Sequence, residues 1–224
     1  RAAFSNQGQI CLCGSRILIE DSIYPQFVNA LVKEIESLKI GDPLDKETQF
    51  GALVSEAHRN KVLSYIELAK QEGGTVLTGG QKYTMSGRCH TGYFVQPTLI
   101  AGLNNQTRCN QEEIFGPILP VKTYKSVDDA IDYVNKHDRP LGLYYFGSDG
   151  SEERKILDRT ISGGVTVNDV VFHVSMEDLP FGGVGPSGMG SYHGLDGFKT
   201  FSHAKAVYSQ PKINVAKLAG LLPP

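Results

Sequence analysis

The residue in this chain best suited to covalent chemistry is Cys11. It lies in segment 4–16, between a glycine-bearing turn at Gly8 and an apolar run that is typical of a strand. A thiol in that position can be held at the edge of a cleft, where its thiolate form would be a nucleophile. On residue type alone, a free cysteine is more often a small buried hydrophobic side chain. The rest of the sequence has to decide between these two interpretations.

A second cysteine, Cys13, follows two residues later. In an extended segment both thiols would point to the same face, and only a turn between them would give them different surroundings. Geometry alone therefore leaves the choice between them open. The other two cysteines, Cys89 and Cys109, add no second paired spacing, and the six histidines are each isolated. The sequence therefore predicts no metal site.

An acidic and an aromatic side chain stand two positions apart in segment 112–117. In an extended chain, Glu113 and Phe115 would share one face. Together they could present a carboxylate to a ribose and a ring to a flat heterocycle. Spacing alone favours the simpler interpretation, a solvated glutamate beside a core phenylalanine.

The segment 183–188 matches the glycine pattern G-x-G-x-x-G. It lacks the context of a dinucleotide-binding fingerprint, because no clean buried strand precedes it and Pro186 lies inside it. No acidic residue ends a second strand about twenty residues later either. A tight loop whose backbone passes close to other backbone is the better interpretation.

Composition narrows the class of protein. The chain has 224 residues, a formal net charge of −2 and 40% hydrophobic residues, which is enough for one large domain or for one domain with an appendage. The scattered basic residues form no patch for a nucleic acid, and no apolar run approaches the roughly 20 residues that a membrane helix needs. Sparse cysteines and the lack of a signal-peptide pattern favour a reduced, cytoplasmic location.

Expected helices alternate with expected strands along the chain. Helices are predicted at 24–38, 55–71, 127–135 and 151–159, and strands or extended segments at 16–20, 75–78, 93–99, 114–124, 143–146, 164–167 and 204–210. Asp21 or Ser22 is expected to cap the first helix, Ser55 the second and Ser126 the third. This order predicts an α/β fold with a largely parallel sheet covered by helices on both faces.

Three separated segments together resemble the aldehyde dehydrogenase family. They are residues 6–11, 112–117 and 179–190, which occur in the family's order and with similar separations. The resemblance covers nearly the whole chain and implies the fold of an aldehyde dehydrogenase catalytic domain. It also singles out Cys11 over Cys13 as the nucleophile.

The resemblance implies a role for several residues. The Cys11 thiolate would attack an aldehyde carbonyl to give a thiohemiacetal, with its own backbone N–H stabilising the oxyanion. Hydride would pass to a nicotinamide, and the resulting thioester would be hydrolysed. Glu113 would hold the nicotinamide ribose, Phe115 would lie beside the nicotinamide, Phe181 would line the substrate tunnel, and Asn168 would shape the site. The implied substrate is a hydrophobic or aromatic aldehyde, and the implied cofactor is NAD or NADP.

The sequence also departs from the family pattern. The Glu-Leu-Gly-Gly motif of the general base, the asparagine that gives a second oxyanion donor and the glycine-rich turn of the Rossmann-type cofactor domain have no counterpart in it. We therefore expect residues 1–203 to be a thiol-bearing catalytic domain truncated at its N-terminus, and residues 204–224 to be an oligomerisation strand and tail. The expected partners are the aldehyde, the missing N-terminal cofactor domain and further copies in a homo-oligomer. The isolated chain is expected to be inactive.

Two further hypotheses concern the chain as a whole. Its first half resembles hydroxymuconic and aminomuconic semialdehyde dehydrogenases, and its second half resembles the class-three and coniferyl aldehyde dehydrogenases, so it is a candidate mosaic joined near Glu113. The alternative to a catalytic domain is a non-catalytic folding or assembly module, a fragment or chimera without turnover of its own. A thiol esterase is less favoured, because no histidine stands at a persuasive position to act as the base.

Overall fold

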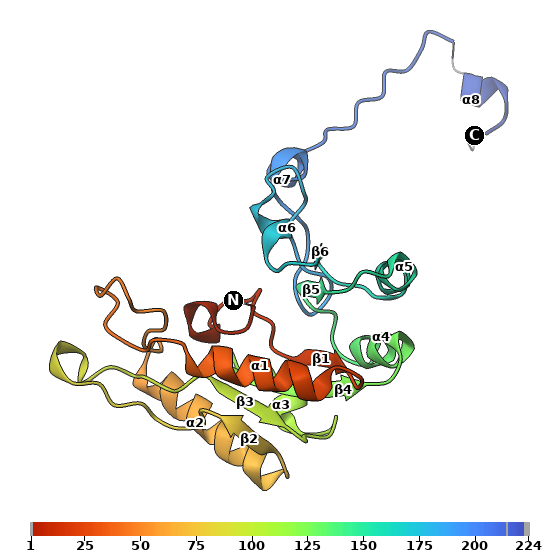
Figure 1. The fold of residues 1–224 in the computed structure, drawn as a ribbon. Coiled ribbons are helices and arrows are strands. Elements are labelled where there is room, and N and C mark those ends of the chain that lie inside the picture. The colour runs from red at the N-terminus through yellow and green to blue at the C-terminus, as the bar shows by residue number, and fades with distance from the viewer. Residues whose placement is uncertain (1, 214, 222–224) are drawn as a thin grey trace.

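The main sheet of the molecule has four strands. The computed structural model describes residues 2–213 and 215–221. The strand order is β1-β4-β3-β2 (Figure 1). β1 (Ile17–Glu20), β4 (Ile118–Tyr124) and β3 (Thr98–Ala101) run parallel, and β2 (Thr75–Thr78) pairs antiparallel with β3. The predicted largely parallel sheet is confirmed.

Helices cover both faces of this sheet. α1 (Tyr24–Glu36) and α2 (Glu56–Gln71) lie on opposite sides of it (Figure 1). Successive residues of β3 serve the two faces, because side chains alternate along a strand. Leu99 packs in the cluster that contains residues of α1, and Ile100 packs in the cluster that contains residues of α2.

Helix starts follow the capping rules in two of the three predicted cases. The Ser55 hydroxyl accepts a hydrogen bond from the His58 amide at 3.2 Å, and Ser126 forms a capping box with Asp129 at the start of α4 (Val127–Asn135). The predicted cap of α1 by Asp21 or Ser22 is wrong, because Ile23 occupies the N-cap position without a side-chain bond. Ser22 instead donates its hydroxyl hydrogen to the Glu20 carboxylate at 2.7 Å.

A second, smaller sheet follows the first. β5 (Gly142–Tyr145) and β6 (Gly164–Val167) pair in parallel, with α5 (Gly150–Arg159) as their crossover. These two strands form their own sheet and do not extend the four-stranded one. α5 is held beside α4 by the Asp128 carboxylate, which accepts from Lys155 at 2.6 Å and also pairs with Arg159.

Several short helices were not predicted. They are η1 (Ser5–Gly8), η2 (Gly87–Cys89), α3 (Arg108–Gln111), α6 (Phe172–Ser175), α7 (Gly194–Thr200) and α8 (Val215–Leu218). A helix of one or two turns is too short to show a 3.6-residue apolar period, so the sequence pattern carries little signal for it. Among the described residues, no helix combines the length and apolar character needed to cross a membrane.

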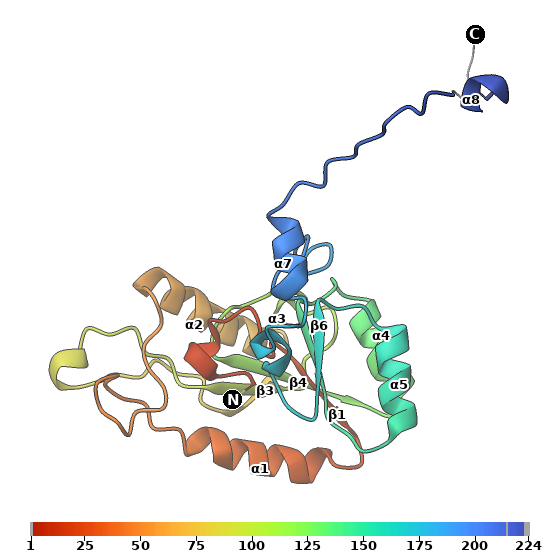
Figure 2. The ribbon, with the colours of Figure 1, turned by 90° about the horizontal axis from the view of Figure 1, so that it is seen from above.

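After α7, residues 203–213 leave the body of the molecule as an extended segment, and α8 lies beyond them (Figure 2). The predicted strand at 204–210 is absent within this chain, where the segment has no regular secondary structure. A strand requires a neighbouring backbone to complete its hydrogen bonds, and no other part of the described chain runs alongside it. The expected role of residues 204–224 in an oligomerisation sheet stays a prediction.

Candidate functional site

Cys11 lies on a tight turn. The Cys13 amide donates to the Ile10 carbonyl at 2.9 Å, which closes the turn around Cys11 and Leu12. Cys11 is exposed, whereas the Leu12 side chain is 6% exposed and therefore buried. The buried leucine anchors the turn and leaves the Cys11 thiol at the surface, where a substrate can reach it.

The turn gives the two thiols different surroundings. Cys13 is half-buried, and its Sγ donates to the Ser5 carbonyl at 3.4 Å. Burial raises the pKa of the Cys13 thiol, so less of it is thiolate near neutral pH. Cys11 is therefore the more exposed thiol of the pair, and Cys13 is the one that burial disfavours as thiolate.

The backbone before Cys11 is held in an uncommon conformation. Asn6, Gln7 and Gly8 have φ values of 46°, 59° and 74°, so three consecutive residues lie in the left-handed region. Gly8 is buried, and a Cβ there would overlap the Gly116 carbonyl group. This close approach brings the Cys11 turn against segment 112–117, about a hundred residues later in the chain.

Glu113 and Phe115 both lie at the surface next to that contact. Ile114 between them is buried, at 5% exposure, while Glu113 is exposed and Phe115 is 39% exposed. Both line a shallow hollow together with Gly8 and Cys13. The interpretation of Phe115 as a core side chain is therefore wrong, since it is partly exposed and lines the same hollow as Glu113.

The neighbouring Glu112 anchors this segment. Its carboxylate accepts from Arg108 at 2.6 and 2.9 Å and also from the Tyr65 hydroxyl. The Arg108 hydrogen bond, and next the Tyr65 one, lower the pKa of Glu112 to about 2. A second contact holds the same segment at Phe115, where the His58 ring Nε2 lies 2.7 Å from the Phe115 carbonyl oxygen. Phe115 itself has a φ of 59°, a strained value that these contacts help to maintain.

Phe181 belongs to a loop closed on itself. It exchanges two backbone hydrogen bonds with Tyr192, at 2.8 and 2.9 Å, and the two rings meet edge to face at 5.5 Å between centroids. The Phe181 ring also stacks on His193 at 5.9 Å. The aromatic face at this position is thus built from three rings that are close in sequence.

Two side chains that the sequence analysis missed connect Phe181 with the Cys11 turn. The Tyr144 hydroxyl donates to the Leu12 carbonyl at 2.6 Å. The His173 ring lies 6.1 Å from the Tyr144 ring and 6.4 Å from the Phe181 ring, so it joins the two. Tyr144 lies within a predicted strand that gave no functional signal, and His173 was one of the six isolated histidines.

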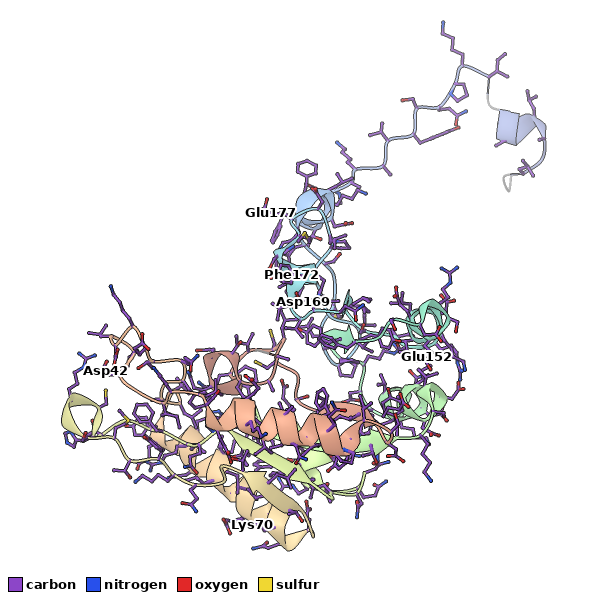
Figure 3. All side chains as sticks on the ribbon, in the orientation of Figure 1. Asp42, Lys70, Glu152, Asp169, Phe172 and Glu177 are labelled. Carbon is purple, nitrogen blue, oxygen red and sulfur yellow. The ribbon has the colours of Figure 1, made fainter. Side chains whose placement is uncertain are left out.

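His173 is the most enclosed polar group of this cluster. Its Nδ1 lies 2.8 Å from the Thr166 hydroxyl, and its buried Nε2 finds no hydrogen-bond partner among the residues that the structure describes. Burial lowers the pKa of the His173 imidazole, so the ring is neutral near pH 7. Asp169 and Phe172, which are labelled in Figure 3, mark the segment that leads from β6 into this cluster.

Asn168 and the glycine loop have structural contacts. The Asn168 side chain bonds both the amide and the carbonyl of Gly147, each at 2.9 Å, and so clamps the ends of β5 and β6 together. A Cβ at Gly183 would overlap the Ser187 carbonyl, which confirms the expected close passage of backbone against backbone in the loop 183–188.

A separate hollow of about 750 Å³ lies between the loop after α1 and the segment after β2. Asp42 lines it and pairs with Arg88, whose hydrogen bond is the largest cause that lowers the pKa of Asp42 to about 2. Figure 3 shows Asp42 far from Phe172. This hollow contains none of the predicted site residues.

Comparison with known proteins identifies the relatives of this chain. The aldehyde dehydrogenase family model matches residues 1–207. A probable coniferyl aldehyde dehydrogenase of Caulobacter vibrioides is 46% identical and covers 98% of the chain, and the dimeric NADP-preferring aldehyde dehydrogenase of Canis lupus familiaris is 38% identical and covers 99%. The chain spans 44% and 46% of the length of these two relatives.

Solved structures agree with the sequence relatives. An NAD-dependent aldehyde dehydrogenase of Sinorhizobium meliloti matches 90% of this chain with a TM-score of 0.84 and 31% identity. Betaine aldehyde dehydrogenase of Staphylococcus aureus, solved in complex with NAD+, matches 89% of it with a TM-score of 0.82 and 31% identity. The chain covers 39% of each of those two chains. The resemblance seen in the sequence is confirmed, and the chain belongs to the aldehyde dehydrogenase family.

Proposed function

We propose that this chain is the thiol-bearing catalytic part of an NAD(P)-dependent aldehyde dehydrogenase, with Cys11 as its nucleophile. The observation that carries the proposal is the exposed Cys11 thiol on a turn whose next side chain, Leu12, is buried. An anchored turn fixes the position of the sulfur, and a fixed reacting atom is what covalent catalysis requires. Membership of the family supplies the reaction class.

The proposed reaction is an oxidation through sulfur. The Cys11 thiolate bonds to the carbonyl carbon of the aldehyde and forms a thiohemiacetal, whose oxyanion accepts from the Cys11 backbone N–H. Loss of hydride from that carbon leaves a thioester. Water then cleaves the carbon–sulfur bond, which releases the carboxylic acid and returns the thiolate.

The residues beside Cys11 fit a nicotinamide cofactor. The exposed carboxylate of Glu113 can accept hydrogen bonds from ribose hydroxyls, and the partly exposed Phe115 ring can lie against a flat heterocycle. When bound, NAD(P)+ supplies the acceptor for the hydride. The names of the relatives include both an NADP-preferring enzyme and NAD-dependent ones, so we propose the pair without choosing between them.

The proposed substrate is a hydrophobic or aromatic aldehyde. Support comes from the ring cluster of Phe181, Tyr192 and His193 and from the coniferyl aldehyde dehydrogenases among the relatives. Aromatic rings that stack on one another offer faces and edges on which a further ring can pack. Because the chain spans less than half of the length of these relatives, we further propose that an N-terminal cofactor-binding domain, which this sequence does not include, and a homo-oligomer complete the site.

The test joins the chain to the part of the Caulobacter relative that it does not match. NADH or NADPH formation is then followed with an aromatic aldehyde, for the chain alone and for the joined protein. We expect activity only in the joined protein, and we expect Cys11→Ala to lower it by at least about 1,000-fold because the covalent route is lost.

Cys13→Ala is the matched control, since it removes the thiol two residues away. It is expected to keep most of the activity. An active Cys11→Ala protein would overturn the assignment of the nucleophile. A folded joined protein without activity on any aldehyde would favour the non-catalytic folding or assembly module.

A further inference from the structure

The Cys11 turn is held by the side chain of Tyr144, which lies 132 positions after Leu12 in the chain. Tyr144 lies on β5, and its hydroxyl donates to the Leu12 carbonyl at 2.6 Å. The Leu12 side chain packs at the same place, because its Cδ2 lies 3.3 Å from where a Cβ at Gly142 would be. The turn therefore rests on β5 through both its side chain and its backbone.

The Tyr144 side chain also faces α6. Its ring lies 6.1 Å from the His173 ring of that helix, and Val171 at the N-cap of α6 has a left-handed φ of 70°. Burial is the main cause that raises the pKa of Tyr144 to about 12, so the group is a neutral hydrogen-bond donor across the working pH range. The Tyr144 hydroxyl thus links the Cys11 turn to β5, and the Tyr144 ring contacts α6.

We propose that Tyr144 is a positioning residue for Cys11, whose hydroxyl holds the Leu12 carbonyl and keeps the Cys11 thiol exposed while Cys13 stays half-buried. The inference rests on the proposed function in taking Cys11 as the nucleophile. The effect of Tyr144 on the conformation of the Cys11 turn can be tested whether or not Cys11 is the nucleophile. Without the hydroxyl, the Leu12 carbonyl loses its donor, and the turn is free to open.

The neighbouring tyrosine provides a matched control. Tyr145 follows on the same strand, so its side chain points to the opposite face of the sheet. Its hydroxyl lies near Gly147, away from the Cys11 turn. Tyr144→Phe and Tyr145→Phe therefore remove the same atom from two sides of one strand.

The experiment measures thiol alkylation in the full chain. Each variant is exposed to iodoacetamide between pH 6 and 10, and the labelling rates of Cys11, Cys13 and Cys109 are read separately by peptide mass spectrometry. Tyr144→Phe is expected to lower the ratio of Cys11 to Cys13 labelling about fivefold, the effect of losing one ordinary hydrogen bond. Tyr145→Phe is expected to leave the ratio at the value of the unsubstituted chain.

Cys109 reports whether the fold survives, because this thiol is 1% exposed in the main core. An unchanged labelling ratio in Tyr144→Phe overturns the positioning role. If Cys109 in Tyr144→Phe is labelled as fast as the other thiols, the positioning role is overturned as well, because the Tyr144 hydroxyl would then be needed to keep the whole chain folded. Neither outcome touches the assignment of Cys11, which depends on the activity of Cys11→Ala.

Discussion

At the scale of single residues, the site depends on a glycine that lies against another backbone. Gly8 has a φ of 74°, and its α-carbon is packed so closely on Gly116 that no side chain fits. That contact is the direct link between the Cys11 turn and the segment of Glu113 and Phe115. The separation of 108 residues between the two glycines shows how distant parts of the chain build one site.

We predict that Gly8→Ala destabilises the protein more than its backbone strain alone explains. A left-handed φ costs an alanine about 1–2 kcal/mol, and the overlap with the Gly116 carbonyl adds to that cost. The total is expected to reach about 3 kcal/mol or more. Urea denaturation followed by circular dichroism measures the free energy of unfolding.

Gly73→Ala separates strain from overlap. Gly73 also has a positive φ, of 89°, but a Cβ there would meet nothing within 4 Å. This variant is expected to lose only about 1–2 kcal/mol. Equal losses in the two variants would show that the contact with Gly116 contributes nothing beyond strain.

At the scale of elements, the acidic anchor of segment 112–117 predicts a dependence of stability on pH. The pKa of Glu112 is lowered in the folded protein to about 2 from an ordinary value of 4.5, first by Arg108 and then by Tyr65. A carboxyl with a lowered pKa stabilises the fold above its unfolded pKa and loses that contribution as pH falls through the folded pKa. The contribution is therefore full above about pH 4.5 and declines toward pH 2.

We predict that Glu112→Gln is less stable than the parent chain near pH 6 and that this difference shrinks as pH falls below about 4.5. The free energy of unfolding at a series of pH values measures it. Glu56→Gln is the control, because Glu56 also pairs with an arginine, Arg59 at 2.7 Å, but outside the site. A difference for Glu112→Gln that is constant from pH 6 to pH 3 would contradict the assignment.

The sequence predicted the longer elements well because their signals are local. Ser55 and Ser126 correctly predicted the starts of α2 and α4, and the glycine pairs on either side of β2 correctly predicted its flanking turns. Contacts over long distances left no such signal. Nothing local at Tyr144 indicates that its hydroxyl meets Leu12, and nothing local at Glu112 indicates the Tyr65 hydroxyl of α2, 47 positions earlier.

The candidate site was partly predictable for a similar reason. The spacing of Glu113 and Phe115 allowed a shared face but favoured a core phenylalanine, whereas Phe115 is 39% exposed with a left-handed φ of 59° that spacing does not reveal. Spacing did not decide between Cys11 and Cys13, because the deciding feature is the turn closed by Ile10. A turn without glycine or proline at its centre has no strong sequence signature.

At the scale of the whole molecule, the hypothesis of a mosaic stays a prediction. The Caulobacter relative aligns with 98% of the chain at 46% identity, so one relative spans both sides of the join near Glu113. A mosaic predicts that residues 1–113 and 114–224 each have a different nearest parent. A single parent with equal identity to both halves would contradict it.

The last prediction concerns the apolar surface of α7 and the extended segment after it. Leu195, Phe198 and Phe201 are 65%, 71% and 88% exposed, and Val207 and Tyr208 on the extended segment are 77% and 80% exposed. Exposed apolar side chains that cluster in this way favour association, and an unpaired extended segment offers its backbone to a neighbouring chain. We therefore expect the purified chain to self-associate.

Light scattering coupled to size-exclusion chromatography tests this expectation, with an apparent mass that rises with concentration above the 24.4 kDa of one chain. Two variants locate the contact: Phe198→Ser with Phe201→Ser on α7, and Val207→Lys with Tyr208→Lys on the extended segment. If the extended segment associates as a strand, the lysine pair should lower the mass more, because charged side chains oppose strand pairing at an edge. If only α7 associates, the serine pair should have the larger effect. A monodisperse monomer at high concentration would show that neither surface holds a second copy, and the proposed homo-oligomer would then have to form through other parts of the full-length protein.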